Sequence, residues 1–357
     1  MPKKRQAEVT YAEVDAEIAC ILDERRREED TSSVETKKKK QRNNKRQKKK
    51  HEYLCAWTDG EDPQWVDAVH LEGTPALREW ENAKEEADIP EIHDPPEVLQ
   101  QKCLNLAQMM KKAKRPVFLL GAGISAPVLP TFRGKNGLWT KNAYKNKKAN
   151  VKVSDGIVAT VAHRGLVELE KAGYVHFVVT QNYDDLSVRS GFPESKLSEL
   201  HGNIFKEVCD DCKKIYRREF EVELANSIDH ETGRKCDDCG GVLRDCIIHF
   251  EESLPFHDLK MANAKFVGAD LTIVLGSSLK VEPAASLPFR SKQRATRNKT
   301  DIKACIVNLQ ETDYDSKADL LIRGTCDAII HAVAKELLGE SWDVESKRMA
   351  KGSAADV

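Results

Sequence analysis

Four short apolar runs, each followed at once by glycine or polar residues, constrain the fold of this chain more than any other feature. They are PVFLLGAG at 116–123, VHFVVTQN at 175–182, LTIVLGSS at 271–278 and ACIVNLQ at 304–310. Strands that are apolar almost throughout are buried on both faces, which is typical of parallel sheets. Helical periodicity lies between some of them, at 158–171 and 327–338. The pattern predicts an α/β fold with a Rossmann-like, doubly wound parallel sheet.

Polar residues stand at the predicted carboxyl end of each of these strands. They are Gly121 and Ser125, Gln181 and Asn182, Gly276 to Ser278, and Asn308. Parallel strands end at a common edge of the sheet, and ligands of doubly wound folds bind along that edge. We therefore expect these residues to line a binding site.

The first strand end reads GAGISA at 121–126 and fits the G-x-G-x-x-G/A pattern. There the glycines allow a tight turn and let backbone N–H groups approach a pyrophosphate. An ordinary strand-to-helix turn without a ligand is the alternative. The dehydrogenase version also requires an acidic residue about 20 positions later, after a second strand. Here the chain enters a loop with Pro127, Pro130 and FRG at 132–134, which argues against an ordinary hydride-transfer enzyme.

Four of the ten cysteines form two Cys-x2-Cys pairs with 23 residues between them. They are Cys209, Cys212, Cys236 and Cys239. This spacing predicts a tetrahedral zinc site in a zinc-ribbon module of about 206–245. Four thiolates leave no open coordination position, so the zinc is expected to be structural. Basic residues near the first pair (Lys213, Lys214, Arg217 and Arg218) leave nucleic-acid binding by the ribbon open.

Charge is distributed unevenly along the 357 residues. The formal net charge is −1, but residues 37–50 (KKKKQRNNKRQKKK) hold ten Lys or Arg and no acid, so the other 343 residues carry −1 − 10 = −11. Such a block is typical of nuclear import and of nucleic-acid or chromatin contact. A solvated tail without a partner is the alternative. A second cationic stretch runs from Arg290 to Lys303.

The two ends of the chain differ in composition from the part that contains the apolar runs. We expect residues 1–97 to form an extension, with a solvated or partner-binding helix at 8–29 and a disordered basic arm at 37–50. Residues 339–357 are expected to form a charged tail. No apolar run approaches 18 residues, so we expect no membrane span.

Several motifs occur in a fixed order between about 98 and 338. They are GAGIS at 121–125, PTFRG at 130–134, NGLW at 136–139, TQNYD at 180–184, ELHGN at 199–203, the two cysteine pairs, HFEESLP at 249–255, LGSSLKVEPAASLP at 275–288, IVNLQ at 306–310 and GTCD at 324–327. The chain therefore resembles the sirtuins, which are NAD-dependent protein deacylases. The residues within these motifs are most similar to those of the nuclear and nucleolar seventh-sirtuin branch, whose members carry basic extensions.

The resemblance implies a role for each matching residue. His201 would be the general base, and Asn182 would act beside it, holding with Gln181 and Asp184 the ribose and amide of the nicotinamide. The rest of the NAD site would be Gly121, Ala122, Gly123 and Ser125, the cofactor-loop residues Phe132 and Arg133, Gly276, Ser277 and Ser278, Asn308, Leu309 and Gln310, and Cys326. Phe250 would line the channel for the acyl-lysine, and the zinc would hold the small domain together.

The same resemblance implies the reaction. The acyl oxygen attacks C1′ of the nicotinamide ribose, nicotinamide leaves, and a base then removes a ribose hydroxyl proton. Histidine suits that step because its ordinary pKa is about 6.5. The expected function is deacylation of histones or other nuclear proteins, giving free lysine, nicotinamide and O-acyl-ADP-ribose. The expected location is the nucleus, including the nucleolus.

Four positions depart from the family's pattern. The cofactor loop is one residue shorter than in the family's usual pattern, and Thr131 stands where that pattern has Asp. Asp185 and Ser187 replace a Gly and a His, and Glu251 replaces a Gly. A lost glycine is costly where the backbone needs a positive φ. A catalytically weak nuclear scaffold and a mono-ADP-ribosyltransferase are therefore alternatives, and a zinc-ribbon nucleic-acid binder without NAD is the third.

Overall fold

The computed structural model describes residues 18–26, 51–57, 64–72, 74, 76–77, 81, 90–131, 153, 156–222, 230–249, 252–292 and 302–342. The chain divides into two compact units, residues 1–88 with 132–149, and residues 89–131 with 150–357. The predictions made for the basic arm 37–50 and for Phe132, Arg133, Phe250 and Glu251 lie outside the described residues.

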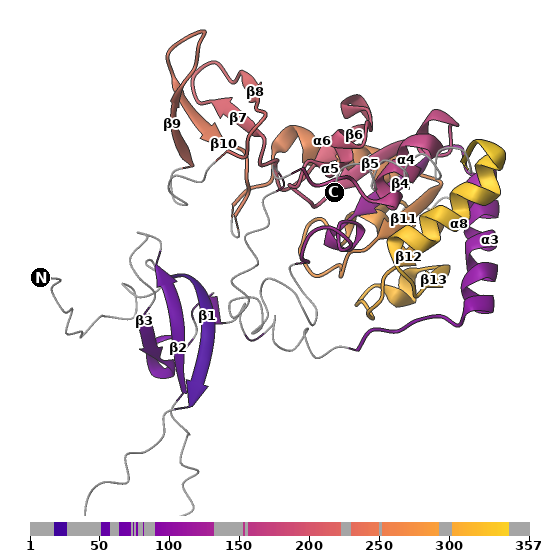
Figure 1. Cartoon of the computed structure of the whole chain (residues 1–357), viewed down its shortest axis with the longest axis horizontal. Coiled ribbons are helices and arrows are strands. Elements are labelled where there is room, and N and C mark those ends of the chain that lie inside the picture. Colours follow the sequence, from indigo (N-terminus) through magenta and orange to yellow (C-terminus); the bar gives the residue numbers. More distant parts are fainter. Residues whose placement is uncertain are drawn as a thin grey trace, which may run out of the picture. The chain divides into compact units, whose positions relative to one another are not determined.

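The first unit contains a three-stranded antiparallel sheet (Figure 1). Its strands β1 (Ile18–Arg26), β2 (His51–Trp57) and β3 (Gln64–Asp67) are neighbours in that order, and the short helix η1 (Ala68–His70) follows. A small core of Ile21, Tyr53, Cys55, Leu71 and Leu77 is buried here. The predicted helix over 8–29 is therefore wrong at 18–26. Pairing with β2 overrides the weak local helix preference of the Glu- and Arg-rich stretch 8–29.

The second unit is built on a six-stranded parallel sheet. Its strands are β4 (Pro116–Leu120), β5 (Phe177–Thr180), β6 (Leu197–Glu199), β11 (Leu271–Leu275), β12 (Lys303–Val307) and β13 (Leu320–Ile322), in the order β13-β12-β11-β4-β5-β6. All five neighbouring pairs are parallel. The four apolar runs lie on β4, β5, β11 and β12, so the predicted sheet is confirmed. The short edge strands β6 and β13 were not predicted.

The strand order creates a switch point between β4 and β11. From β4 the chain moves outward through β5 and β6, and then returns to the other side of β4 at β11. This is the Rossmann order, and such sheets bind ligands outside the carboxyl ends of the strands on either side of the switch point. The topology therefore predicts a ligand site at the loops after β4 and β11.

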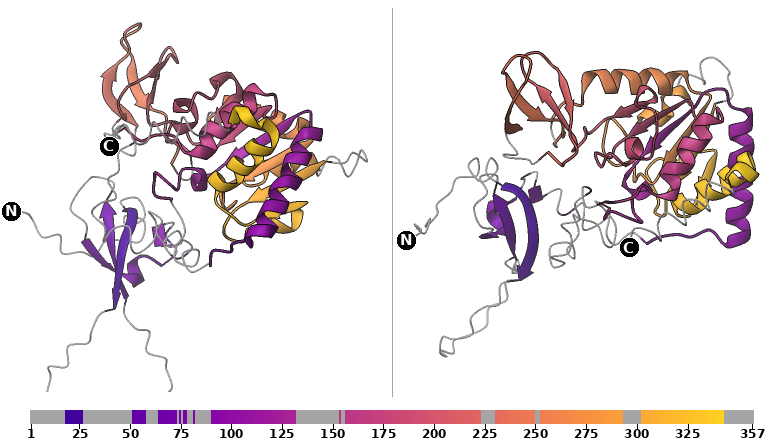
Figure 2. Two further views of the ribbon diagram at one scale, coloured as in Figure 1. Left: turned by 45° about the vertical axis from the view of Figure 1, so that its right-hand side comes forward. Right: turned by 45° about the horizontal axis from the view of Figure 1, so that its top comes forward.

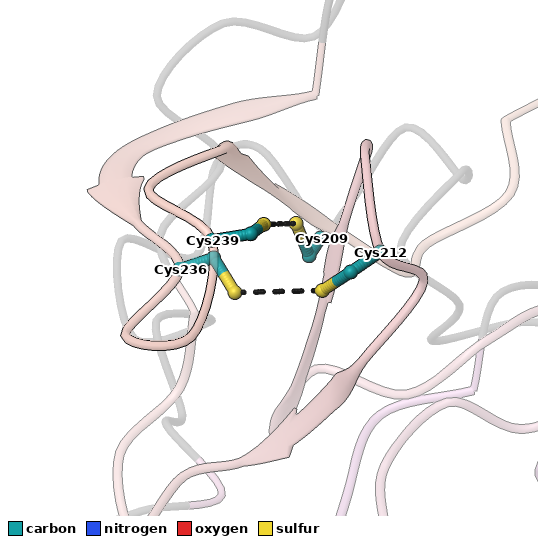
Figure 3. A group of neighbouring side chains, drawn as sticks. All are labelled: Cys209, Cys212, Cys236 and Cys239. Carbon is teal, nitrogen blue, oxygen red and sulfur yellow. Dashed lines mark hydrogen bonds between the residues drawn. The ribbon is translucent and has the colours of Figure 1, made fainter.

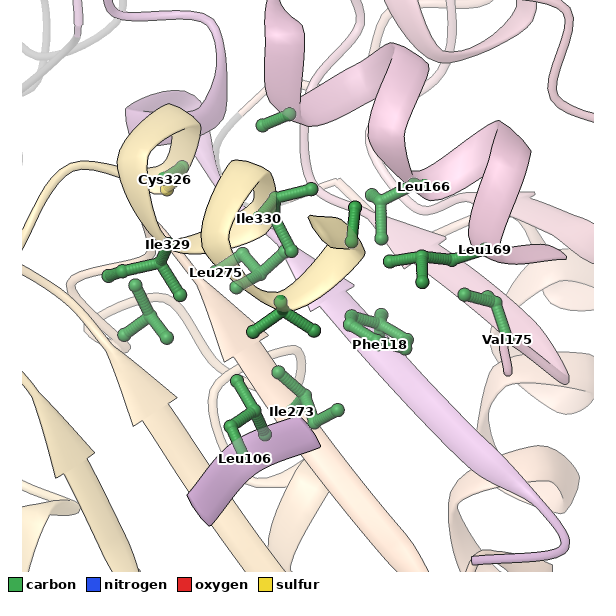
Figure 4. Packing of buried hydrophobic residues seen from close by; sticks show 14 of the residues in the cluster. Leu106, Phe118, Leu166, Leu169, Val175, Ile273, Leu275, Cys326, Ile329 and Ile330 are labelled. Carbon is green, nitrogen blue, oxygen red and sulfur yellow. The ribbon is translucent and has the colours of Figure 1, made fainter. Parts of the chain in front are cut away.

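Helices cover both faces of the parallel sheet. The helices α3 (Pro96–Lys112), α4 (Val161–Lys171) and α8 (Cys326–Leu338) cover one face. There Phe118, Ile273 and Leu275 of the strands lie in one buried cluster with Leu166 and Ile330 of the helices (Figure 4). On the other face the alternate strand residues pack against α6 (Phe256–Gly268) and η5 (Leu287–Phe289). Burial on both faces explains why these strands read as continuous apolar runs.

A second, smaller sheet lies between β6 and α6 in the chain. Its antiparallel strands are β7 (Lys206–Cys209), β8 (Ile215–Arg217), β9 (Glu231–Lys235) and β10 (Val242–Asp245), in the order β8-β7-β10-β9. Figure 2 shows this sheet beside the parallel sheet, separate from its layers. Its bounds match the predicted module at about 206–245. The remaining short helices are η2 (Ala122–Ile124), α5 (Leu186–Arg189), η4 (Glu194–Lys196) and η6 (Asp315–Lys317).

The core extends beyond the predicted end of the domain. Trp342 is fully buried in the cluster beneath α4 and α8, and its indole N–H donates to Nδ1 of His331 over 3.2 Å. The prediction of a charged tail from 339 onward is therefore wrong for 339–342. At the other end, the second unit begins at Ile89 rather than at 98. In the part of the chain that the structure describes, no helix is long and apolar enough to cross a membrane.

Candidate functional site

Three glycines bring two backbone segments into direct contact at the switch point. The N–H of Gly123, after β4, donates to the carbonyl of Gly276, after β11, over 2.8 Å. A Cβ atom on Gly121 would lie 2.6 Å from the Gly276 oxygen, and Gly276 itself has a φ of +64°. Only glycine fits such a contact. The predicted glycine turn therefore forms, and the chain after η2 continues as turns, with no second βα unit in the described stretch up to Thr131.

A buried polar network joins this turn to the loop after β5. The Asn182 amide donates to the Gly121 carbonyl over 3.2 Å and to Oγ of Ser125 over 3.4 Å. Ser125 in turn donates to Oδ2 of Asp184 over 2.6 Å, and Oδ1 of Asp184 accepts the Leu186 N–H. Burial raises the pKa of Asp184, and the hydrogen bonds only partly oppose that shift. The network fixes the Asn182 side chain at the switch point.

His201 is held by the backbone of the same loop. Its Nδ1 lies 2.8 Å from the carbonyl oxygen of Gln181. A carbonyl can only accept, so we assign the proton of the neutral ring to Nδ1, which leaves Nε2 able to take up a proton. Burial lowers the pKa of His201, against the opposing effect of this hydrogen bond. The imidazole is therefore neutral near pH 7, as a general base must be.

Gln181 also links His201 to the end of β11. Oγ of Ser277 donates to Oε1 of Gln181 over 2.6 Å, and Ser278 follows in the same turn. Gly202, directly after His201, has a φ of +82°, and a Cβ atom there would lie 1.6 Å from the Cys246 oxygen. The His201 carbonyl accepts the N–H of Ile248 over 3.2 Å. The chain returning from the small sheet thus packs directly against the His201 loop.

The loop after β12 completes the same edge of the sheet. The Asn308 amide donates to the Gln310 carbonyl over 3.0 Å. The guanidinium of Arg323 donates to two backbone carbonyls, that of Asn308 over 3.2 Å and that of Gln310 over 2.6 Å. Leu309 accepts the Ile92 N–H through its own carbonyl. Arg323 also pairs with the Asp315 carboxylate. The sequence interpretation missed Arg323, because two of its partners are backbone carbonyl groups, which leave no side-chain signature.

Cys326 begins helix α8, close in sequence to the strand β13. It is buried, and burial raises the pKa of its thiol to about 12. The thiol is therefore protonated at neutral pH, so it suits van der Waals contact with a ligand rather than nucleophilic chemistry. The structure thus brings the predicted residues of four strand ends to one edge of the sheet, and the predicted residue Cys326 lies at the start of α8.

The four predicted zinc ligands come together in the small sheet (Figure 3). All four sulfur atoms lie within 4.8 Å of one another, with Cys209 and Cys239 3.4 Å apart and Cys212 and Cys236 3.6 Å apart. Thiolates about 2.3 Å from a tetrahedral zinc would be about 3.8 Å apart. The sulfur positions therefore fit zinc, and the complete thiolate set predicts a structural ion.

Comparison with known proteins gives a consistent family. The model of the Sir2 family matches residues 144–283. Relatives include "NAD-dependent protein deacetylase SRT1" of Oryza sativa subsp. indica, 42% identical over 249 residues that cover 69% of this chain and 50% of the relative. "NAD-dependent protein deacetylase Sirt6" of Drosophila melanogaster is 37% identical, with 70% and 79% covered. "NAD-dependent protein deacetylase sirtuin-7" of Bos taurus is 39% identical, with 75% and 67% covered.

Solved structures agree. A structure described as "Sir2-p53 peptide-NAD+" matches with a TM-score of 0.51 and 32% identity, over 65% of this chain and 97% of that chain. The chain spans about half the length of the SRT1 relatives that it matches. The resemblance seen in the sequence is confirmed, with relatives named sirtuin-7, Sirt6 and SRT1 in a similar range of identity. This chain belongs to the Sir2 family, the sirtuins.

Proposed function

We propose that this protein is an NAD-dependent protein-lysine deacylase. Acyl-lysine, NAD and water would give free lysine, nicotinamide and O-acyl-ADP-ribose. The observation that carries the proposal is the His201 imidazole, whose Nδ1 is occupied by the Gln181 carbonyl at the carboxyl edge of a Rossmann-type sheet. A neutral histidine beside a dinucleotide site is the group that this reaction requires. Solved relatives described with NAD+ and with acetyl-ADP-ribose support the same chemistry.

The site divides into three parts in this proposal. NAD phosphates and the adenosine half would lie against Gly121, Ala122, Gly123, Ser125, Phe132, Arg133, Gly276, Ser277, Ser278, Asn308, Leu309, Gln310 and Cys326. Gln181, Asn182 and Asp184 would hold the nicotinamide ribose and amide. Phe250 would line the acyl-lysine channel. The close glycine packing at the switch point supports the phosphate assignment, because it removes side chains where a pyrophosphate must approach backbone N–H groups.

His201 would act after nicotinamide has left. The acyl oxygen first attacks C1′ of the ribose, and the C1′–nicotinamide bond breaks. Nε2 of His201 then takes the proton of a ribose hydroxyl, and the resulting oxygen attacks the carbon of the former acyl group. Water and a returned proton release the lysine amine. The first step needs binding and orientation, whereas the second needs the base.

One departure from the family's pattern bears on turnover. Asp185 replaces a glycine, and its φ of +62° lies in the left-handed region that glycine favours. Aspartate reaches this region more easily than most residues do. The backbone of the loop can therefore keep its form without the glycine, which supports an active enzyme over a catalytically weak scaffold.

We propose histones or other nuclear proteins as substrates, and the nucleus, including the nucleolus, as the location. The ten basic residues at 37–50 support contact with nucleic acid or chromatin. The relative of Bos taurus named sirtuin-7 is 39% identical to this chain over 282 residues.

The test is a panel of acyl-lysine peptides from histone and other sequences, assayed by mass spectrometry with and without NAD. His201→Ala should lower formation of O-acyl-ADP-ribose by about 10²- to 10⁴-fold, because the base is lost. His176→Ala is the control, since His176 lies at the opposite, amino-terminal edge of the sheet, where its N–H donates to Pro116.

Three results would contradict the proposal. Absence of turnover on every peptide would favour the scaffold alternative. Label from NAD that appears on the protein instead of on O-acyl-ADP-ribose would indicate mono-ADP-ribosyl transfer. Equal rates in His201→Ala and wild type would remove His201 from the reaction.

A further inference from the structure

Asp185 places a buried carboxylate at the position where the family pattern given above has a glycine. The residue follows β5 by a short loop, and its side chain is 1% exposed. Its left-handed backbone conformation is the one that a glycine would adopt. The substitution therefore keeps the path of the chain and introduces a charged group into the interior, where a charge is stable only if it is paired.

Three side chains from three different elements bind this carboxylate. The amide of Asn203, after β6, donates to Oδ1 over 2.7 Å, and Nη2 of Arg217, on β8, donates to Oδ2 over 2.6 Å. Nε of Arg189, on α5, lies 3.4 Å from the same oxygen. Both carboxylate oxygens are thus satisfied, and one of their partners belongs to the sheet that carries the zinc ligands.

One of these partners, Asn203, lies only two positions after the proposed base His201. Asn203 follows His201 and Gly202, and its own side chain is almost fully buried. The loops at 181–185 and 201–204 are joined at three points. The first is the Gln181 carbonyl with His201, the second is the Ile204 N–H donating to the Tyr183 carbonyl over 3.0 Å, and the third is the Asp185 carboxylate with Asn203. The first two use backbone carbonyls, so the third alone depends on which side chain occupies position 185.

We propose that Asp185 is a positioning residue that couples the zinc module, through Arg217, to the loop that carries His201. Misplacement of a catalytic group by about 1 Å can cost about 10²-fold in rate, so a side-chain bond next to the base can affect turnover. The inference rests on the proposed function, in which His201 acts after nicotinamide release. It predicts that Asp185 matters for the second step of the reaction more than for the first.

A cavity beside Asp185 offers a way to restore the missing group. Its volume is about 530 Å³, and its lining includes Asp185, Arg164, Arg189, Arg217 and Arg218. Without the carboxylate, the guanidinium groups of Arg189 and Arg217 lose their shared anion. A small carboxylate such as formate can then enter from the cavity and take its place.

The experiment compares two rates in the full-length protein. Exchange of labelled nicotinamide into NAD reports reversal of the first step, and O-acyl-ADP-ribose formation also requires the base. Asp185→Gly, which restores the family's residue, should leave exchange within about 2-fold of wild type and lower product formation about 10-fold or more. Asp185→Asn suits the left-handed region but has a single acceptor oxygen, so it cannot accept from both Asn203 and Arg217. Its product formation should lie between those of wild type and Asp185→Gly. Formate, but not chloride at equal ionic strength, should raise product formation by Asp185→Gly.

Glu207→Gln is the matched control. Glu207 is a fully buried carboxylate that pairs with Arg218 and Arg234 inside the zinc module and does not contact the His201 loop in the described part of the chain. This variant should keep the wild-type ratio of product formation to exchange. Zinc content and unfolding midpoints of each variant separate lost folding from lost positioning, and Asp185→Asn carries the test if Asp185→Gly does not fold.

Equal loss of both rates in the Asp185 variants, an unchanged ratio, or no response to formate would overturn the inference. The proposed function fails in a different way, through wild-type protein that neither exchanges nicotinamide nor forms O-acyl-ADP-ribose. The two failures are therefore distinguishable in one set of assays.

Discussion

At the scale of single residues, one backbone carbonyl sets the chemistry of the site. The Gln181 carbonyl fixes the tautomer of His201, and the Gln181 side chain simultaneously binds Ser277 from the neighbouring strand end. Burial lowers the pKa of His201. The ring is therefore kept in its basic, neutral form over a wider pH range than a solvated histidine.

This shift predicts the acidic limb of the pH–rate profile. Protonation of His201 inactivates the base, so the rate should fall as pH decreases, with an inflection below the ordinary histidine value of 6.5. Product formation measured from pH 5 to 8 checks this, with nicotinamide exchange as the internal comparison, because exchange does not require the base. An inflection above 6.5 would contradict the assigned environment of the ring.

At the scale of elements, the zinc module supports the site without contributing chemistry. It is inserted between β6 and α6, and the chain entering and leaving it frames the His201 loop. Gly202 packs against the Cys246 carbonyl, and Ile248 donates to the His201 carbonyl. Because the zinc ligands tie β7 to the turn after β9, loss of the ion should loosen both flanks of that loop.

Metal exchange tests this support. Removal of zinc by a chelator should abolish product formation, since a four-thiolate zinc site contributes directly to folding of its module. Cobalt should restore most of the rate and show the absorption of a tetrahedral thiolate site. If the rate instead changed strongly with the identity of the metal, the ion would have a chemical role that a closed thiolate set does not allow.

At the scale of the whole molecule, the parallel sheet holds the site because both of its faces are closed. The core on the α3–α4–α8 face ends with Trp342, whose ring lies close to Gly165 on α4. A side chain at Gly165 would collide with Ile330 at 2.4 Å, so α4 and α8 pack in direct contact there. The last described residue of the chain is therefore part of the fold.

Trp342→Ala should lower the free energy of unfolding by about 3–5 kcal/mol, because a fully buried aromatic ring leaves a large cavity. Phe256→Ala is the matched control, since Phe256 is 79% exposed, and it should change stability by less than about 0.5 kcal/mol. Denaturant unfolding of both variants measures the difference. Similar stabilities would show that Trp342 does not belong to the core.

Local sequence patterns predicted the central strands of the parallel sheet and most residues of the candidate site. The strands β4, β5, β11 and β12 could be read directly because burial on both faces demands continuous apolar runs. The zinc ligands could be read because paired cysteines have little other use at that spacing. The order of the motifs, including those around Asn182 and His201, indicates the family from the sequence alone.

Interactions between residues far apart in the chain decided the rest. Strand β1 pairs with β2, whereas the Glu- and Arg-rich stretch around it, without Pro or Gly, favours a helix. The edge strands β6 and β13 are too short to carry a pattern, and the burial of Trp342 depends on how α4 and α8 pack. By sequence alone, Asp185 is a costly loss of a glycine, and only its contacts with Asn203 and Arg217 show a use for the carboxylate. The sequence specifies which residue stands at each position, but the tertiary fold decides which groups lie next to a buried charge.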